Sequence, residues 1–259
     1  MPIRVSAELS HVCSLEDIPK HASALESRGY FRVWVPDTAV SPWEAWLAAT
    51  IVAQRTDRLQ IGLGVTNPYT RHPVVVAQMA ATLQQMSGGR LAMSIGKGVE
   101  KFLKKAGIEH HASAVEECIT VLRSLIAGER TSLEGSVFHI DGMRLRTPAP
   151  VAPVLLYLAA IGLPSWEAAL RVADGVATIW SDEVAQNRQK VMADRALPTA
   201  ALIPFSLTKS DFFEHRATSV EELEERIAVL EGEGVDEVII AYADLDDLEA
   251  AAGRIGARA

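Results

Sequence analysis

Residues 59–95, LQIGLGVTNPYTRHPVVVAQMAATLQQMSGGRLAMSI, decide the fold. Two apolar runs, at 59–65 and 90–95, flank a helical stretch at 72–85 that ends at a Gly-Gly pair. Continuous apolar runs of this length are typical of parallel strands that are buried on both faces. The stretch is therefore predicted to form a strand, a helix and a second strand parallel to the first.

The same alternation of strand and helix extends along the chain in both directions. The other six predicted strands lie at 3–8, 31–35, 154–159, 175–179, 200–207 and 237–241. Crossover helices of about 10–15 residues favour parallel pairing between successive strands. One piece, Glu129–Arg146, breaks the rhythm, and its Asp141-Gly142 pair between apolar segments predicts a β-hairpin insertion.

Eight strand–helix pairs predict an α/β fold, namely a (β/α)8 TIM barrel. Because no linker is evident, residues 1–259 are expected to form a single domain. The hairpin is inserted before strand five. An open, doubly wound sheet is the alternative. A dinucleotide-binding sheet would need a Gly-x-Gly-x-x-Gly motif after strand one, and residues 6–10 contain no glycine.

Composition and charge exclude several classes of protein. With 49% hydrophobic and 22% charged residues, the chain is neither disordered nor collagenous. The lack of an apolar run of about 18 residues argues against a membrane protein, and the N-terminus does not resemble a signal peptide. Two cysteines build neither a disulfide framework nor a Cys-based zinc site. The net charge of −8 argues against nucleic-acid binding. A cytoplasmic protein is expected.

Several local features are expected to be structural. The helix at 42–54 is predicted to begin after Ser41 as N-cap, with Pro42 at its first position. His21 is expected on a helix surface. The His110-His111 pair has no evident third ligand nearby, so no metal site is predicted.

The active site of such a barrel lies at the C-terminal ends of its strands. Gly96-Lys97-Gly98 follows strand four, where glycines allow close approach and the lysine adds charge. This segment forms either a phosphate cradle or an ordinary tight turn. Gly162 precedes a predicted helix whose free N–H groups form either an anion site or an ordinary helix start.

Residues 62–98 resemble the luciferase-like flavin and deazaflavin oxidoreductases, within them the coenzyme F420-dependent branch typified by methylenetetrahydromethanopterin reductase. The segment TNPYTRHP at 66–73 is the most specific part, because FMN-dependent monooxygenases of the superfamily usually differ there. Other segments agree in order: GYFRVWVPD at 29–37, PVLLYLAAIG at 153–162, VADGVATIW at 172–180 and SVEELEERIAVLEGEGVDEVII at 219–240.

The resemblance implies a cofactor ring lying over the C-terminal strand ends. A non-prolyl cis peptide, here Gly64–Val65, would form a bulge in strand three that supports the ring. The positions that would bind cofactor are Gly64, Val65, Thr66, Asn67, Gly96, Lys97, Gly98, Ala160 and Gly162. The cofactor would be F420, with FMN as the alternative.

The resemblance also implies hydride transfer, for which the protein supplies a proton donor. Glu8 matches a family carboxylate at the end of strand one and is the first choice for the general acid. Asp37 and His72 are alternatives. For each of the three, a structural hydrogen bond to a neighbouring loop is the competing interpretation.

The implied function is an F420-dependent oxidoreductase acting on a small organic substrate. An FMN-dependent luciferase-like monooxygenase and a non-catalytic flavin-binding barrel protein are the alternatives. A homodimer is expected, because barrels of this superfamily commonly dimerise. Thr38 stands where relatives often carry His, and Val99 stands where methanopterin reductases carry Asp. The connection after strand seven, Thr208–Ala217, is shortened relative to the family.

Overall fold

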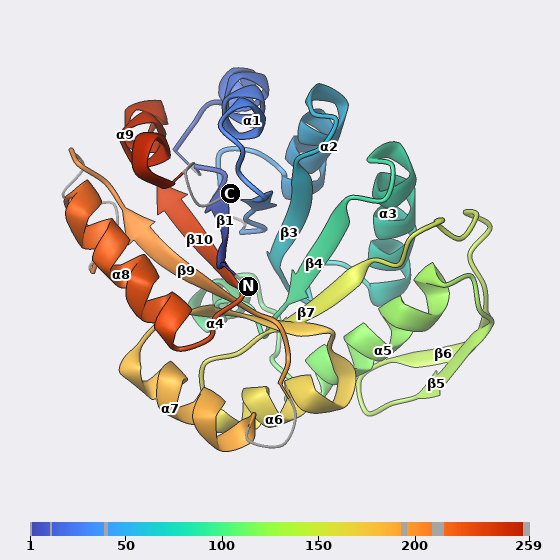
Figure 1. Cartoon of the computed structure of the whole chain (residues 1–259). Coiled ribbons are helices and arrows are strands. Elements are labelled where there is room, and N and C mark those ends of the chain that lie inside the picture. The colour runs from blue at the N-terminus through green and yellow to red at the C-terminus, as the bar shows by residue number, and fades with distance from the viewer. Residues whose placement is uncertain (1, 11, 39–40, 193–195, 209–214, 256–259) are drawn as a thin grey trace.

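The computed structural model describes residues 2–10, 12–38, 41–192, 196–208 and 215–255. Within them, eight parallel strands close into a barrel surrounded by helices (Figure 1). The strands are β1 Arg4–Glu8, β2 Arg32–Val35, β3 Gln60–Thr66, β4 Leu91–Ile95, β7 Leu155–Ala159, β8 Gly175–Ile179, β9 Thr199–Phe205 and β10 Glu237–Tyr242. The parallel pairing of β1 with β10 closes the ring and confirms the predicted (β/α)8 barrel.

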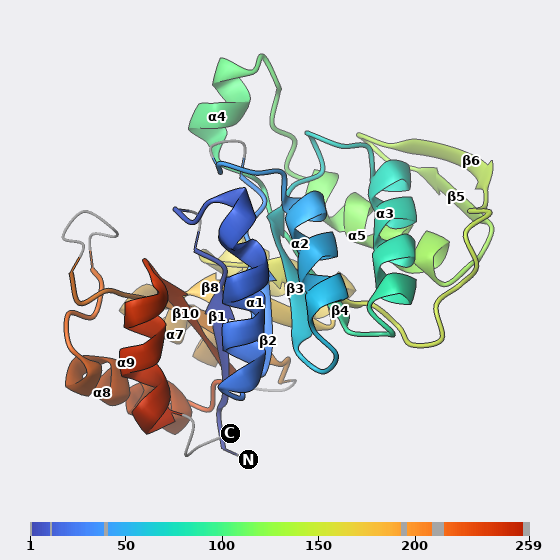
Figure 2. The ribbon, with the colours of Figure 1, turned by 90° about the horizontal axis from the view of Figure 1, so that it is seen from above.

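The helices lie between successive strands and cover the outside of the barrel (Figures 1 and 2). They are α1 Ile18–Ser27, α2 Ala45–Arg55, α3 Pro73–Met86, α4 Glu100–Lys105, α5 Ala114–Ile126, α6 Leu163–Val172, α7 Asp182–Val191, α8 Val220–Gly232 and α9 Leu245–Ile255. The short helix α4 is absent from the sequence prediction. Its signal was the Glu100/Lys104 pair, four residues apart, which forms an ion pair of 2.8 Å.

The predicted insertion is an antiparallel hairpin of β5 Thr131–Glu134 and β6 His139–Met143. Its turn lies at 135–138, so the Asp141-Gly142 pair that indicated the hairpin lies inside β6 instead. The carboxylate of Glu117, on α5, accepts hydrogen bonds from the backbone N–H groups of 136–138 at 2.9, 3.1 and 3.0 Å. These bonds outweigh the opposing effect of burial and lower the pKa of Glu117 to about 2. A carboxylate far away in sequence therefore fixes the turn.

A buried polar network fills the N-terminal end of the barrel interior. The Glu237 carboxylate accepts hydrogen bonds from Arg32 Nη1 at 2.6 Å, Ser6 Oγ at 2.7 Å and Trp34 Nε1 at 2.9 Å. The Arg32 guanidinium also lies over the Trp34 and Tyr157 rings. These five side chains are at most 3% exposed, so they close this end of the barrel.

Two local predictions are wrong. Helix α2 begins at Ala45, and its N-cap is Glu44, whose carboxylate accepts from the Leu47 N–H at 2.9 Å. Ser41 therefore does not cap it. His21 is buried, because its Nδ1 lies 2.7 Å from the hydroxyl of Tyr242, a partner 221 residues away. Burial is the largest cause that lowers the pKa of His21.

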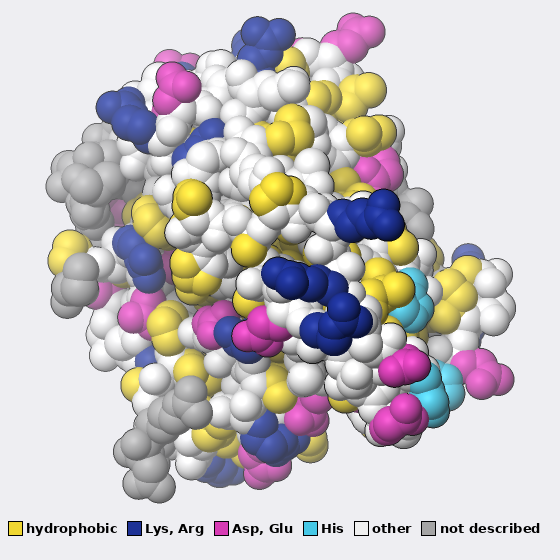
Figure 3. All heavy atoms as spheres, turned by 90° about the vertical axis from the view of Figure 1, so that its right-hand side faces the viewer, with side chains coloured by type: hydrophobic (Ala, Val, Ile, Leu, Met, Phe, Trp, Pro, Cys, Tyr) yellow, Lys and Arg dark blue, Asp and Glu magenta, His cyan; other side chains and the backbone are white. Residues whose placement is uncertain are grey.

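One face of the molecule has a mixed surface. The face over α3, α5 and the hairpin carries basic and acidic side chains next to one another, with hydrophobic side chains between them (Figure 3). Across the described residues, no helix is both long and apolar enough to cross a membrane. Part of the connection after strand seven, at 209–214, lies outside the described residues.

Candidate functional site

The C-terminal end of the barrel interior is lined by small residues. Gly64, Gly96, Ala159 and Ala241 lie at the ends of β3, β4, β7 and β10. A Cβ added to Gly96 would lie 2.6 Å from Val65 Cγ1 and 2.9 Å from Ala159 Cβ. The three strand ends therefore meet as closely as a glycine permits, and we call the small residues Gly64, Gly96, Ala159 and Ala241 the floor of the barrel mouth.

Strand β3 has an irregular end at this floor. The Gly64–Val65 peptide is cis, as the family resemblance implies, and the register of β3 against β4 shifts between Leu63 and Thr66. Gly64 has φ +151°, and its α-carbon lies so close to β4 that a Cβ would be 2.7 Å from the carbonyl oxygen of Ser94. Val65 is 44% exposed between the buried Gly64 and Thr66, so the bulge presents an aliphatic side chain at the mouth.

Glu8 brings a titratable group to the mouth from the end of β1. Because Ser6 points into the barrel interior toward Glu237, Glu8, two residues further along the strand, points to the same side. Burial raises the pKa of the Glu8 carboxyl to about 7, since taking it out of water disfavours the charged form. The carboxyl can therefore hold or release a proton near neutral pH.

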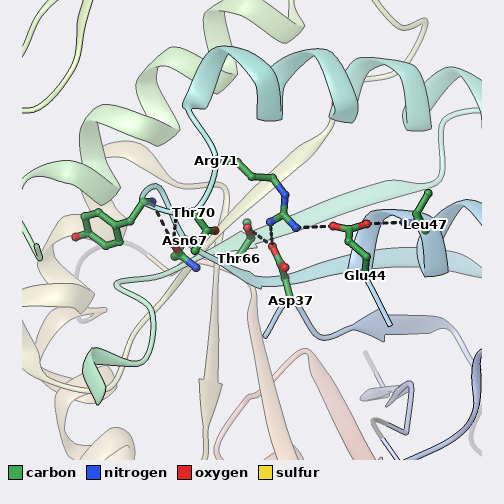
Figure 4. A network of polar contacts seen from close by, with 8 residues as sticks. Asp37, Glu44, Leu47, Thr66, Asn67, Thr70 and Arg71 are labelled. Carbon is green, nitrogen blue, oxygen red and sulfur yellow. Dashed lines mark hydrogen bonds and ion pairs between the residues drawn. The ribbon is translucent and has the colours of Figure 1, made fainter. Parts of the chain in front are cut away.

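Asp37 belongs to a network that ties the ends of β2 and β3 together (Figure 4). Its Oδ2 accepts hydrogen bonds from Thr66 Oγ1 at 2.6 Å and from Arg71 Nη1 at 2.8 Å. The other end of the Arg71 guanidinium pairs with Glu44, the N-cap of α2. Asp37 accepts from two donors here, a geometry that suits an anchor for the loop better than a proton donor.

The loop after β3 is held by its own side chains. Asn67 Oδ1 accepts from the N–H groups of Tyr69 and Thr70, both at 3.1 Å (Figure 4). Gly98, with φ +71°, packs against it, since a Cβ there would lie 3.3 Å from Asn67 Cβ. Asn67 is thus fixed beside the glycines that follow β4, and Lys97 between those glycines is exposed.

His72 makes its contacts with helix α3 and the hairpin. Its Nδ1 accepts from the Val74 N–H at 3.3 Å as the N-cap of α3, and its ring packs edge-on against Phe138 of the hairpin. The ring is exposed. The contacts of His72 therefore agree with the structural interpretation, and a catalytic role has no support from its position.

The segment after β7 combines a buried and an exposed part. The buried Ala160 donates its N–H to the Ala177 carbonyl at 3.0 Å, so this N–H is not available to a ligand. Gly162 is the N-cap of α6 and has no side chain to satisfy the helix N–H groups. Ser165 Oγ donates to the Gly162 carbonyl at 2.6 Å and accepts from the Ile161 N–H at 3.2 Å.

Sequence reasoning missed two members of the site. Arg71 links Asp37 to Glu44, and the Tyr69 hydroxyl donates to the His111 carbonyl at 2.9 Å. Both lie in the TNPYTRHP segment, where a charged and an aromatic side chain follow a turn residue. The hollow of about 380 Å³ at the opposite end, around Gly29 and Arg58, contains none of the predicted site residues.

A family assignment follows from comparison with known proteins. Residues 1–201 match the family model described as luciferase-like monooxygenase. The chain belongs to this family. It is 30% identical over 161 residues to 5,10-methylenetetrahydromethanopterin reductase of Methanolobus tindarius, covering 61% of this chain and 48% of the relative. It is 33% identical over 187 residues to F420-dependent hydroxymycolic acid dehydrogenase of Mycobacterium tuberculosis, covering 66% and 51%.

The likeness in fold to a solved structure extends over the whole barrel. The solved structure of coenzyme F420 dependent tetrahydromethanopterin reductase from Methanopyrus kandleri matches with a TM-score of 0.82 at 18% identity, over 99% of this chain and 98% of that chain. This likeness concerns the fold alone. The chain spans about half the length of the curated relatives it matches, at 48% and 51%.

Proposed function

We propose that this luciferase-like protein is an F420-dependent oxidoreductase that transfers a hydride between the deazaflavin and a small organic substrate. The observation that carries the proposal is the mouth of the barrel, where a floor of small residues adjoins the carboxyl of Glu8 with its pKa of about 7. The likeness to F420-dependent hydroxymycolic acid dehydrogenase supports F420 as the cofactor.

The residues at the mouth fit a flat tricyclic ring. Gly64 and Gly96 have no room for a Cβ because atoms of the neighbouring strands fill that space, so the strand ends pack closely together beneath the proposed ring. The exposed side chain of Val65 gives an apolar support, while Thr66 and Asn67 stand at the rim. In this proposal Gly96-Lys97-Gly98 and the N-terminus of α6 after Ala160 and Gly162 receive the phosphate end.

The protein orients the reactants and handles the proton. The deazaflavin, when bound, would supply the hydride, and Glu8 Oε would donate a proton to the substrate atom next to the carbon that is reduced. The network of Asp37, Thr66 and Arg71 holds the end of β3 in place beneath the reactants. Thr38 stands where relatives often carry His, so Glu8 carries the proton transfer alone in this proposal.

Binding of cofactors to the protein tests the function directly. We expect oxidised and reduced F420 to bind, with a change in deazaflavin fluorescence, and FMN to bind much more weakly or not at all. Binding of FMN alone would overturn the proposal in favour of a luciferase-like monooxygenase. Binding of neither would favour a non-catalytic barrel protein. The homodimer and the cytoplasmic location remain predictions. Gel filtration with light scattering tests the homodimer.

Gly96→Ala is expected to weaken F420 binding by roughly tenfold or more, because the new methyl group pushes Val65 and Ala159 out of the floor. Fluorescence titration measures the affinity, and a thermal melt checks that the variant folds. Gly232→Ala is the matched control, since a Cβ at this helical position on α8 meets nothing within 4 Å. Equal affinity of Gly96→Ala and the wild type would contradict the proposed ring position.

A further inference from the structure

The mouth of the barrel has two sides that differ in their strands. Strands β3, β4 and β7 follow one another around the ring and contribute the floor residues Gly64, Gly96 and Ala159. Strands β8, β9, β10 and β1 follow one another on the other side. The proposed function uses Glu8 from this second side and gives no role to β8 or β9.

An aliphatic side chain points into the mouth from the end of β8. Ala177 belongs to the cluster of side chains that fills the barrel interior together with Trp34 and Tyr157. Because side chains alternate along a strand, Ile179, two residues further, points to the same side as Ala177. Ile179 is nevertheless 53% exposed. The protein therefore leaves this inward-pointing side chain accessible from the mouth.

Strand β9 continues the same surface. Leu202 pairs with Ile179 in the register of β8 and β9, packs against the interior cluster and is partly exposed. Pro204, two residues further, faces the same side as Leu202 and is also partly exposed. We call Ile179, Leu202 and Pro204 the aliphatic wall.

The aliphatic wall adjoins Glu8 through Ala241. In the register of the sheet, Ala241 on β10 pairs with Pro204 on one side and with Glu8 on the other. Of the wall residues, Ala241 and Glu8, all of which the structure describes, only Glu8 has a side chain that can form a hydrogen bond. A substrate on this side therefore contacts a hydrocarbon surface and one carboxyl group.

The place where barrels of this kind often bind a phosphate is already filled by a side chain. That place lies at the loops after the last two strands, which are β9 and β10 here. The N–H of Leu207 donates to Asp247 Oδ1 at 2.8 Å, and the N–H of Ala243 donates to Asp247 Oδ2 at 3.1 Å. Asp247 lies in the first turn of α9 and is 1% exposed. An internal carboxylate thus takes two backbone N–H groups that could otherwise bind an anionic substrate group.

The charges near the mouth also oppose an anionic substrate. The Arg71 guanidinium is already paired with Asp37 and Glu44. Burial raises the pKa of Glu8 to about 7, and a carboxylate or phosphate beside this group would be repelled by its ionised form. The net charge of −8 acts in the same direction. An uncharged substrate avoids all of these costs.

We propose that the substrate is an uncharged, largely aliphatic molecule whose hydrocarbon part packs against the aliphatic wall, while its reacting atoms lie between the floor and Glu8. The inference rests on the proposed function, because it takes Glu8 as the group that delivers the proton. Aliphatic and alicyclic alcohols, ketones and enones belong to this class, whereas sugar phosphates and carboxylic acids do not. Each CH2 group that leaves water for the wall adds to the affinity.

Aliphatic probes test the substrate class by binding alone. Calorimetric titration of the protein mixed with oxidised F420 measures the dissociation constants of 1-butanol, 1-hexanol and 1-octanol, and of hexanoate and hexylammonium, at about pH 6, where both ions are charged. We expect the affinity of the alcohols to rise by about two- to fourfold for each added CH2 group. We expect 1-hexanol to bind about tenfold or more tightly than either ion. Equal or tighter binding of an ion, or affinity that does not depend on chain length, would overturn the proposal.

Ile179→Ser is expected to lower the affinity for 1-octanol by about three- to tenfold and to weaken the dependence on chain length, because it removes hydrocarbon from the wall. Val229→Ser is the matched control, since Val229 is similarly exposed, at 58%, but lies on α8 outside the barrel. A thermal melt checks that both variants fold. If both variants weaken binding equally, or if neither does, the aliphatic wall is not the binding surface and the proposal is wrong.

The substrate class and the proposed function fail separately. If F420 does not bind, the proposed function fails, whichever probe binds. If F420 binds and the probes show no preference for an uncharged chain, the substrate class is wrong while the proposed function stands.

Discussion

Glu237→Ala is expected to lower the free energy of unfolding by about 3–5 kcal/mol, because it leaves the Arg32 guanidinium buried without its counter-charge. Arg32 Nη1 lies 2.6 Å from Glu237 Oε2, and both side chains are at most 3% exposed. Ser6 and Trp34 lose their acceptor at the same time. Urea unfolding followed by tryptophan fluorescence measures the change as a shift of the midpoint.

Two further variants separate the buried charge from other effects. Glu100→Ala removes one member of an exposed ion pair, and we expect it to cost less than about 1 kcal/mol. The double variant Arg32→Met/Glu237→Leu removes both charges and is expected to recover much of the loss. Equal costs for Glu237→Ala and Glu100→Ala would show that the network contributes little to stability.

Glu8→Gln is expected to slow hydride transfer by about 10²- to 10⁴-fold, the usual contribution of a general acid, without loss of cofactor binding. The Glu8 carboxyl, with its pKa of about 7, is protonated below that pH, so the rate of substrate reduction falls as the pH rises through about 7. The glutamine variant lacks this limb of the profile. Rates of deazaflavin oxidation between pH 5.5 and 9 measure it.

The stability of the same variant gives a test that needs no substrate. Folding raises the Glu8 pKa from its ordinary value of 4.5 to about 7, so the folded chain binds more protons than the unfolded chain between about pH 4.5 and 7. The contribution of Glu8 to stability is therefore most favourable below pH 4.5 and is lost as the pH rises to about 7. Glu8→Gln should abolish this part of the pH dependence of unfolding.

Asp37→Asn is the matched control for Glu8. It weakens the ion pair with Arg71 and is expected to lower affinity for the cofactor, while the limb near pH 7 remains. If Asp37→Asn loses the fall in rate near pH 7 and Glu8→Gln keeps it, Asp37 rather than Glu8 is the general acid.

Periodicity and composition predicted the parts of the fold that depend on local pattern. The eight strands could be read from apolar runs such as IGLGV and VIIA, which only a sheet covered on both faces can bury. The cis peptide at Gly64–Val65 was available only through the family resemblance, because no local rule marks it.

The sequence could not predict what depends on distant partners. Glu44 rather than Ser41 caps α2 because Arg71, from another loop, holds its carboxylate. His21 is buried because Tyr242 meets it across the fold. The hairpin turn lies at 135–138 because Glu117 satisfies its N–H groups. In the candidate site, the hydrogen bonds of Asp37 with Thr66 and Arg71 could not be predicted for the same reason, because they join two different loops.

The buried network at Arg32 and Glu237 closes the N-terminal end of the barrel, so a ligand can reach the barrel interior only from the C-terminal end. A molecule lying on the floor at Gly64 and Gly96 can then enter and leave only past whatever lies above it. If the proposed function holds, the ring would bind first and depart last, and the second reactant would exchange on top of it. Steady-state kinetics with product inhibition should accordingly show a compulsory order.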